Sequence, residues 1–289
     1  MSEYAAGRTP IPCVRCNTFT KFRDLVHKAD AIDAPFIATG HYARAVRGEL
    51  FRGADDAKDQ TYFLWGIDRG VLPRMLLPVG ELTKAETRAL ARELGLSVVA
   101  EKPESQEICF VPDGDYVQVL QRRLGPTAPA LSRGPFVLSD GTVVGEHEGF
   151  ARFTVGQRRG VPGGYAHAMF VVAIRAESRE VVIGPREELL GRGVVAREVS
   201  WLVAAPPAVG DQVGVRVRHR APIVPAHVLR LAAGEIELAL EQPVAAIAPG
   251  QSLVLYDGAR VLGGGFIAAM RRQLPAFGGR ARETVSATS

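Results

Sequence analysis

The sequence of 289 residues is 47% hydrophobic and 23% charged, a globular composition that excludes a largely disordered chain. Three cysteines in this length exclude a disulfide framework and favour a reducing compartment, while a net charge of +4 permits a nucleic-acid partner without requiring one. The N-terminus has no basic stretch leading into an apolar one, and no uncharged run reaches the roughly 18 apolar residues of a membrane span, so we expect a cytoplasmic protein without a membrane partner.

The first 110 residues alternate between predicted helices and short apolar strands. A helix is expected from Asn17 or Thr18, either of which fits the N-cap, because apolar side chains then recur at helical spacing. The run 34–40, "APFIATG", is typical of a buried strand that ends in a loop. Thr83 and Glu86 form a capping-box pattern that predicts a second helix, which Gly95 would end. This alternation indicates an α/β region.

After one more predicted helix at 115–125, short runs rich in Val, Ile and Leu indicate a mostly β structure. Their regular spacing toward the C-terminus suggests a small barrel, and the stretch "AAPPAVG" offers a possible boundary near residue 205. We expect a partial α/β domain, a central mixed domain, a β-barrel and a disordered tail. Their expected ranges are 1–111, 112–190, 191–274 and 275–289.

The motif Cys13-x-x-Cys16 has several interpretations. A zinc half-site needs two further ligands, which the remaining Cys109 and six scattered histidines do not supply at suitable spacing, so no metal is expected. A redox pair would need a preceding strand, but the preceding segment contains two prolines. The third interpretation makes Cys16 a nucleophile, since it precedes the expected helix N-cap, where backbone N–H groups favour a thiolate. Two unreactive, partly buried thiols are the alternative.

Other polar groups carry weaker signals. Gly40 and His41 follow a predicted parallel strand, at the end where open α/β sheets bind ligands, although a structural loop histidine is common. Lys58, Asp59 and Gln60 precede an aromatic run and alone indicate a polar helix start, and Cys109 alone indicates a core strand. A basic row on a later strand would suit an RNA backbone or simply face solvent. Its members are Arg216, Arg218, His219 and Arg220.

The sequence contains no complete phosphate-binding loop. Neither G-x-x-x-x-G-K-[ST], nor G-x-G-x-x-G after a strand, nor the S-G-G-x-D-S loop of ATP pyrophosphatases is present. The glycines of "VLGGGFI" lie between late predicted strands with no helix after them.

Seven ordered blocks between residues 3 and about 268 resemble the tRNA-specific 2-thiouridylases. They include "GRTPIPCVRCNTFTKF", "IATGHYAR", "DDAKDQTYFLW", "SQEICF" and "GQSLVLYDGARVLGGGFI". The resemblance implies an enzyme that uses ATP, with Mg²⁺, to adenylate O2 of a wobble uridine in tRNA. It also implies replacement of that oxygen by sulfur, which a carrier protein delivers as a cysteine persulfide. The fold implied is an incomplete Rossmann-like ATP-pyrophosphatase layer, a small mixed domain and a C-terminal β-barrel.

The resemblance assigns roles to individual residues. Cys16 matches the nucleophile and Cys109 the persulfide-bearing cysteine, and these two thiols would form a disulfide as sulfur is released. Gly40 matches an ATP contact, and positions 11–13 match the segment beside the target base. The tRNA-contacting residues implied are Ile11, Pro12, Cys13, His41, Lys58, Asp59, Gln60, Arg218, His219 and Gln251.

Two departures from the family pattern leave alternatives. Ile11 stands where the family usually has Asn, and Cys13 where it often has Asp. The S-G-G-x-D-S loop is missing, so a truncated, catalytically inactive tRNA-binding protein is the alternative to a sulfurtransferase. A different ATP pyrophosphatase, such as an amidotransferase-type ligase, would have no use for two distant cysteines.

Overall fold

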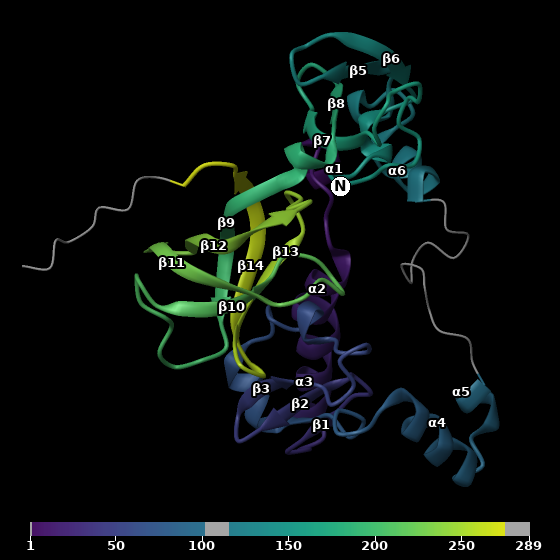
Figure 1. Cartoon of the computed structure of the whole chain (residues 1–289). Helices are drawn as coiled ribbons and strands as arrows, with labels where there is room; N and C mark the ends of the chain where they lie inside the picture. Colours follow the sequence, from purple (N-terminus) through teal and green to yellow (C-terminus); the bar gives the residue numbers. More distant parts are fainter. Residues whose placement is uncertain (1, 102–115, 275–289) are drawn as a thin grey trace, which may run out of the picture.

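The computed structural model describes residues 2–101 and 116–274. Figure 1 shows three parts: an N-terminal α/β region, a middle domain and a C-terminal β-barrel. Cys109 and the expected tail at 275–289 lie outside the described residues. No helix within the described residues is long and apolar enough to cross a membrane.

The first residues of the chain lie on the middle domain and not on the N-terminal α/β region. Helix α1 (Ser2–Ala5) packs on the middle domain, where Tyr4 stacks on Tyr116 with ring centroids 5.9 Å apart. The chain then runs along the barrel into a continuous helical segment (Figure 1). That segment consists of α2 (Pro12–Cys16), a π-helical turn, η1 (Asn17–Lys21), and α3 (Phe22–Ala31).

The helix predicted from residue 17 is confirmed, but its predicted start is wrong. The helix begins at Pro12, whose fixed φ suits the first helical position, and the N-cap residue Ile11 has no capping side chain. Asn17 is therefore inside the helix, with φ −64° and ψ −48°, and does not cap it.

A short parallel pair lies beside this helix. The predicted strand at 34–40 is confirmed as β1 (Ile37–Ala38), which pairs with β4 (Met75–Leu76). Hairpin β2 (Ala43–Val46) and β3 (Glu49–Arg52) joins the sheet of the barrel through β3 and β14. Two 3₁₀ turns follow, η2 (Thr61–Phe63) and η3 (Arg69–Arg74).

The capping box at Thr83 is confirmed and opens α4 (Lys84–Glu93). Thr83 Oγ1 accepts a hydrogen bond from the Glu86 N–H at 3.2 Å, and a Glu86 carboxylate oxygen accepts one from the Thr83 N–H at 2.7 Å. Gly95 follows the helix with φ +73°, the conformation that ends helices. Helix α4 buries none of its side chains and leads into α5 (Ser97–Glu101).

The middle domain combines one helix with a four-stranded sheet in the order β6-β5-β8-β7. Helix α6 (Tyr116–Leu124) covers a core that includes Phe136, Phe150 and Ile183. The strands are β5 (Gly134–Leu138), β6 (Val143–His147), β7 (Phe170–Arg175) and β8 (Glu180–Gly184), and the 3₁₀ turns are η4 (Pro129–Leu131), η5 (Phe150–Arg152) and η6 (Arg186–Leu189).

The C-terminal part is a closed barrel, as predicted. Six strands pair in the order β13-β10-β11-β12-β9-β14, and β14 pairs back with β13. The expected boundary near residue 205 is wrong, because that loop connects two strands of the same barrel. The strands are β9 (Leu190–Trp201), β10 (Gln212–Arg216), β11 (Val224–Ala232), β12 (Glu235–Ala245), β13 (Ser252–Asp257) and β14 (Arg260–Arg271).

Candidate functional site

Cys13 and Cys16 lie one turn apart in the helix that starts at Pro12, and both are half-buried. The expected placement of Cys16 before the N-cap is wrong. The backbone N–H groups without a partner at a helix start belong to its first turn. Cys16 is the fifth residue of this helix and therefore lies beyond them. The expected disulfide is absent from the described residues, which do not include Cys109.

The residue after Cys16 fastens the helix to the segment at 58–63. Asn17 is buried, and its Nδ2 donates to the Phe63 carbonyl oxygen at 3.0 Å. Its Oδ1 has no hydrogen-bond partner among the described residues. The Phe63 ring in turn lies against His219 with centroids 4.6 Å apart. The helix that carries Cys16, the segment 58–63 and the barrel therefore meet at Asn17, the residue after Cys16.

Asp59 and Gln60 are anchored to the protein. The Asp59 carboxylate is buried and accepts hydrogen bonds from the Thr61 hydroxyl at 2.9 Å and from Arg216 Nη1 at 2.8 Å. Gln60 Oε1 accepts from the Tyr42 N–H at 2.8 Å, and the Gln60 N–H donates to the Tyr42 oxygen at 2.9 Å. Gln60 thus fixes the loop that carries His41. A direct contact between Asp59 and tRNA does not fit this conformation.

Gly40 and His41 lie in the loop after β1, at the carboxyl end of the parallel pair. The His41 Nδ1 and Thr39 Oγ1 share a hydrogen bond of 2.8 Å, and the ring lies beside Phe22 of α3. Burial, with a smaller contribution from the charge of Lys21, lowers the pKa of His41 to about 4. His41 is therefore neutral at physiological pH, and its ring offers a hydrogen bond rather than a positive charge.

The expected basic row along a strand is wrong, because β10 ends at Arg216 and residues 218–220 lie in the loop that follows it. Arg216 ends β10 and is buried, because it pairs with Asp59 and its guanidinium carbon lies 5.6 Å from the centre of the Tyr256 ring. Arg218 is exposed just after the strand, and His219 packs on the aromatic rings of Tyr62 and Phe63. Burial, then the charges of Arg220 and Arg216, lowers the pKa of His219.

Gln251 meets the N-terminal segment. Its Nε2 donates to the Thr9 carbonyl oxygen at 3.0 Å, and the Thr9 N–H donates to the Pro249 oxygen at 3.0 Å. These bonds hold the chain just before Ile11 and Pro12, which begin the helix that carries both cysteines. Two parts of the expected tRNA surface, positions 11–13 and Gln251, are thus neighbours.

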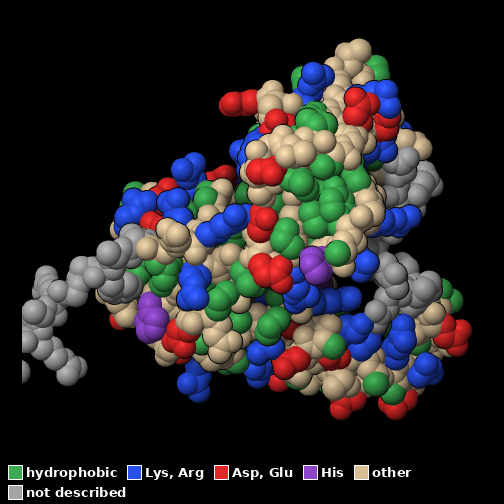
Figure 2. Space-filling model, turned by 45° about the horizontal axis from the view of Figure 1, so that its top comes forward, with side chains coloured by type: hydrophobic (Ala, Val, Ile, Leu, Met, Phe, Trp, Pro, Cys, Tyr) green, Lys and Arg blue, Asp and Glu red, His purple; other side chains and the backbone are tan. Residues whose placement is uncertain are grey.

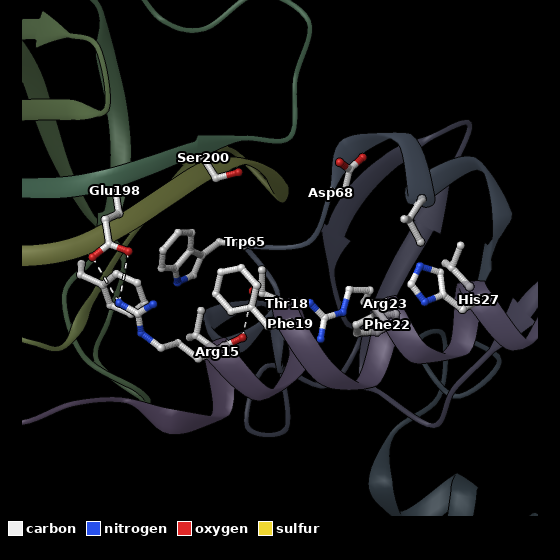
Figure 3. A pocket seen from close by; sticks show the side chains of 15 residues that line it. Arg15, Thr18, Phe19, Phe22, Arg23, His27, Trp65, Asp68, Glu198 and Ser200 are labelled. Atoms are coloured by element: carbon white, nitrogen blue, oxygen red, sulfur yellow. Dashed lines mark hydrogen bonds and ion pairs between the residues drawn. The ribbon is translucent and has the colours of Figure 1, made fainter. Parts of the chain in front are cut away.

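One pocket runs along this helical segment, and a second lies beside its start. Figure 3 shows the larger, about 580 Å³, between one face of the helix, Trp65 and the barrel. The second, about 430 Å³, lies between the N-terminal segment, α6 and the barrel, and Ile11 and Pro12 line it. Arg15, absent from the sequence-based predictions, lines both pockets. Its guanidinium donates to Glu198 at 3.1 Å and lies 4.7 Å from the centre of the Phe266 ring.

The described residues include no group of three or more His, Cys, Asp or Glu side chains that could hold a metal ion. In Figure 2, hydrophobic side chains gather over the middle domain, and Lys and Arg side chains lie beneath them, toward the N-terminal region. Sequence reasoning missed Arg15 altogether and named Asn17 and Arg216 in other roles, as a helix N-cap and as a member of the basic row. Their contact partners lie 46 to 183 residues away, so local patterns could not identify their roles.

Family models match the three parts of the chain in order. Residues 1–113 match the tRNA methyl transferase HUP domain, residues 118–185 the tRNA methyl transferase PRC-barrel domain, and residues 191–267 the aminomethyltransferase β-barrel domain.

Curated relatives are similar over nearly the whole chain. A tRNA-specific 2-thiouridylase MnmA from Geobacter metallireducens is 46% identical over 274 residues, which cover 93% of this chain and 73% of that protein. The proteins of the same name from Rhodopirellula baltica and Rhodospirillum centenum are 46% and 47% identical. Their alignments cover 92% of this chain and 68% and 69% of the relatives.

Proposed function

Because the chain belongs to the tRNA-specific 2-thiouridylase family, we propose that it transfers persulfide sulfur to C2 of the wobble uridine of tRNA. The observation that carries the proposal is the position of Cys16. It lies in the helix whose next residue, Asn17, is bonded to Phe63, and Phe63 packs on His219 of the barrel. These contacts support the proposal, because they bring the helix that carries Cys16 against segments implied to contact tRNA. The names of the relatives give no support to an inactive tRNA-binding protein.

The proposed reaction needs an activated uridine, because the oxygen on C2 is a poor leaving group. ATP, when bound, supplies the adenylyl group that activates O2. Gly40 suits the approach of a nucleotide, since it lies at the carboxyl end of β1 and, apart from its chain neighbours, no described residue has an atom within 4 Å of where its Cβ would be. The described residues form no site of their own for Mg²⁺.

The sulfur chemistry is divided between two thiols. The terminal sulfur of a persulfide on Cys109 attacks C2, and the bond from C2 to the activated oxygen breaks, so that the oxygen leaves as part of AMP. The Cys16 thiolate then attacks the Cys109 sulfur, so that a Cys16–Cys109 disulfide forms and the other sulfur stays on C2. An external thiol reduces the disulfide, and a sulfur-carrier protein restores the persulfide. Cys109 lies outside the described residues, so its role rests on the resemblance.

The chain's own surface orients the substrate. Arg218 is exposed and suits a phosphate contact, whereas neutral His41 suits a hydrogen bond to a base or ribose. Ile11 is buried beside the pocket next to the helix start and therefore offers an apolar wall near the target base.

The test is complementation of a bacterial strain that lacks its own thiouridylase. We expect this chain to restore 2-thiouridine in tRNA, measured by mass spectrometry of nucleosides. Cys16→Ser should reduce the product at least about a hundredfold, because Ser is a far weaker nucleophile toward sulfur. Thr20→Ser, a change at an exposed residue of the same helical segment, should retain most of it. Full thiolation by Cys16→Ser would refute the assignment of the nucleophile.

A further inference from the structure

A buried ion pair joins the two segments that the resemblance assigns to tRNA contact. Asp59 Oδ2 and Arg216 Nη1 are 2.8 Å apart, although the residues are 157 positions apart in sequence. The side chain of Asp59 is 0% exposed and that of Arg216 only 7%. The pair therefore bridges the N-terminal region and the barrel out of contact with solvent.

The carboxylate of Asp59 is hydrogen-bonded to other protein groups. Besides the bond from Arg216, it accepts hydrogen bonds from the Thr61 N–H at 3.2 Å and from the Thr61 hydroxyl. Arg52 Nε lies 3.6 Å from the carboxylate. The Thr61 hydroxyl also lies 3.2 Å from the Tyr256 hydroxyl of β13. A carboxylate so enclosed cannot reach a nucleic acid, and an exposed one would repel phosphates.

Groups suited to RNA lie on both sides of the pair. Lys58 and Gln60 flank Asp59, and Arg218 and His219 follow Arg216 by two and three positions. Further bonds extend the junction, since Tyr62 Oη donates to the Ser252 oxygen at 3.0 Å and Trp65 Nε1 donates to Ser252 Oγ at 2.9 Å. Together with the Asp59–Arg216 pair, these bonds hold the segment at 59–65 against the barrel.

We propose that Asp59 and Arg216 are positioning residues for tRNA, holding segments 58–60 and 218–219 in one register without touching the nucleic acid. The inference rests on the proposed function and changes the implied role of Asp59 from contact to support. Removing one member of the ion pair leaves the other as a buried, unpaired charge. Replacing both by apolar side chains of similar volume removes the link between the two segments without leaving an unpaired charge. Comparing single with double replacements therefore distinguishes an effect on the stability of the protein from an effect on tRNA binding.

The experiment measures the affinity of the full chain for unmodified tRNA across a salt series, with melting temperature recorded for every variant. Asp59→Leu/Arg216→Met should fold with a melting temperature close to that of the wild type and raise Kd about tenfold. Arg216→Met alone should also weaken binding, and Arg216→Lys, which keeps the cation, should restore most of the affinity that Arg216→Met loses. The slope of log K against log salt should stay unchanged in all three, because no phosphate contact is removed.

Two further variants complete the comparison. Arg218→Ala should weaken binding and reduce the salt slope by about one, as expected for a phosphate contact. Glu148→Gln, which removes an exposed ion-paired carboxylate of the middle domain, should leave Kd unchanged. A wild-type Kd for the double variant, or a reduced salt slope for Arg216→Met, would overturn the proposal. A wild-type chain that binds no tRNA would instead refute the proposed function.

Discussion

His41 shows how burial changes the chemistry of a single side chain. As a sequence feature, Gly40-His41 suggested a ligand-binding loop, and the structure places the ring against Phe22 with Thr39 at its Nδ1. Because the pKa falls to about 4, His41 contributes a hydrogen bond rather than a charge at neutral pH.

This burial has a consequence for stability. The unfolded chain binds a proton at His41 near pH 6.5, whereas the folded protein does so only near pH 4. The unfolded state is therefore increasingly favoured as pH falls through that interval, and stability is regained as pH rises. We expect wild type to lose about 2 kcal/mol more than His41→Gln between about pH 8 and pH 5, measured by urea unfolding. Equal losses would show that the ring is protonated in the folded protein.

The role of Asp59 could not be predicted from its neighbours in the sequence. The pair Cys13 and Cys16 was visible as a motif, but the burial of Asp59 was not, because its partner Arg216 lies in another part of the chain. A charged residue in a polar run is ordinarily exposed, so composition pointed to the surface.

At the scale of elements, helix α4 was predictable and the start of α2 was not. A capping box joins residues three positions apart, so its sequence signature is local. Helix α2 begins after Ile11, which has no capping side chain, and Pro12 was the remaining signal. The strands of the barrel were visible as Val-rich runs, and the predicted closure is formed by pairing between β13 and β14.

The capping box gives a prediction confined to one helix. Thr83→Ala should destabilise α4 by about 1 kcal/mol, since it leaves the Glu86 N–H without its acceptor. Helix α4 buries no side chain, so the melting temperature of the whole protein should change little. Hydrogen exchange at residues 84–93 is the measurement, and Thr87→Ala, within the same helix, is the matched control. Unchanged exchange in Thr83→Ala would contradict the role of the cap.

At the scale of the whole molecule, the N-terminal segment links the three parts. Glu3 and Arg8 pair at 2.7 Å beside the middle domain, and Thr9 is bonded both to the barrel and to Thr154 of the middle domain. Arg15 then reaches Glu198 on β9. Sequence order suggested separate consecutive domains, but these long-range contacts place the first residues on the later ones.

Gly250 tests this link. It has φ +90°, and a Cβ there would lie 2.7 Å from the Thr9 oxygen. Gly250→Ala should therefore lower the melting temperature by several degrees, at roughly 2–4 °C per kcal/mol, and expose residues 2–11 to proteolysis. Gly258→Ala is the matched control, because Gly258 also has positive φ, but among the described residues only its chain neighbours have atoms within 4 Å of its Cβ position. Equal effects of the two changes would mean that the docking of Thr9 adds nothing.

The central claim is that this chain transfers sulfur to uridine through Cys16. The most direct measurement is a single-turnover reaction of the purified chain with unmodified tRNA, ATP and a persulfide donor, followed by quantification of 2-thiouridine. We expect product with wild type and Thr20→Ser and none above background with Cys16→Ser. Product formed equally by Cys16→Ser, or no product from wild type under conditions in which a relative is active, would contradict it.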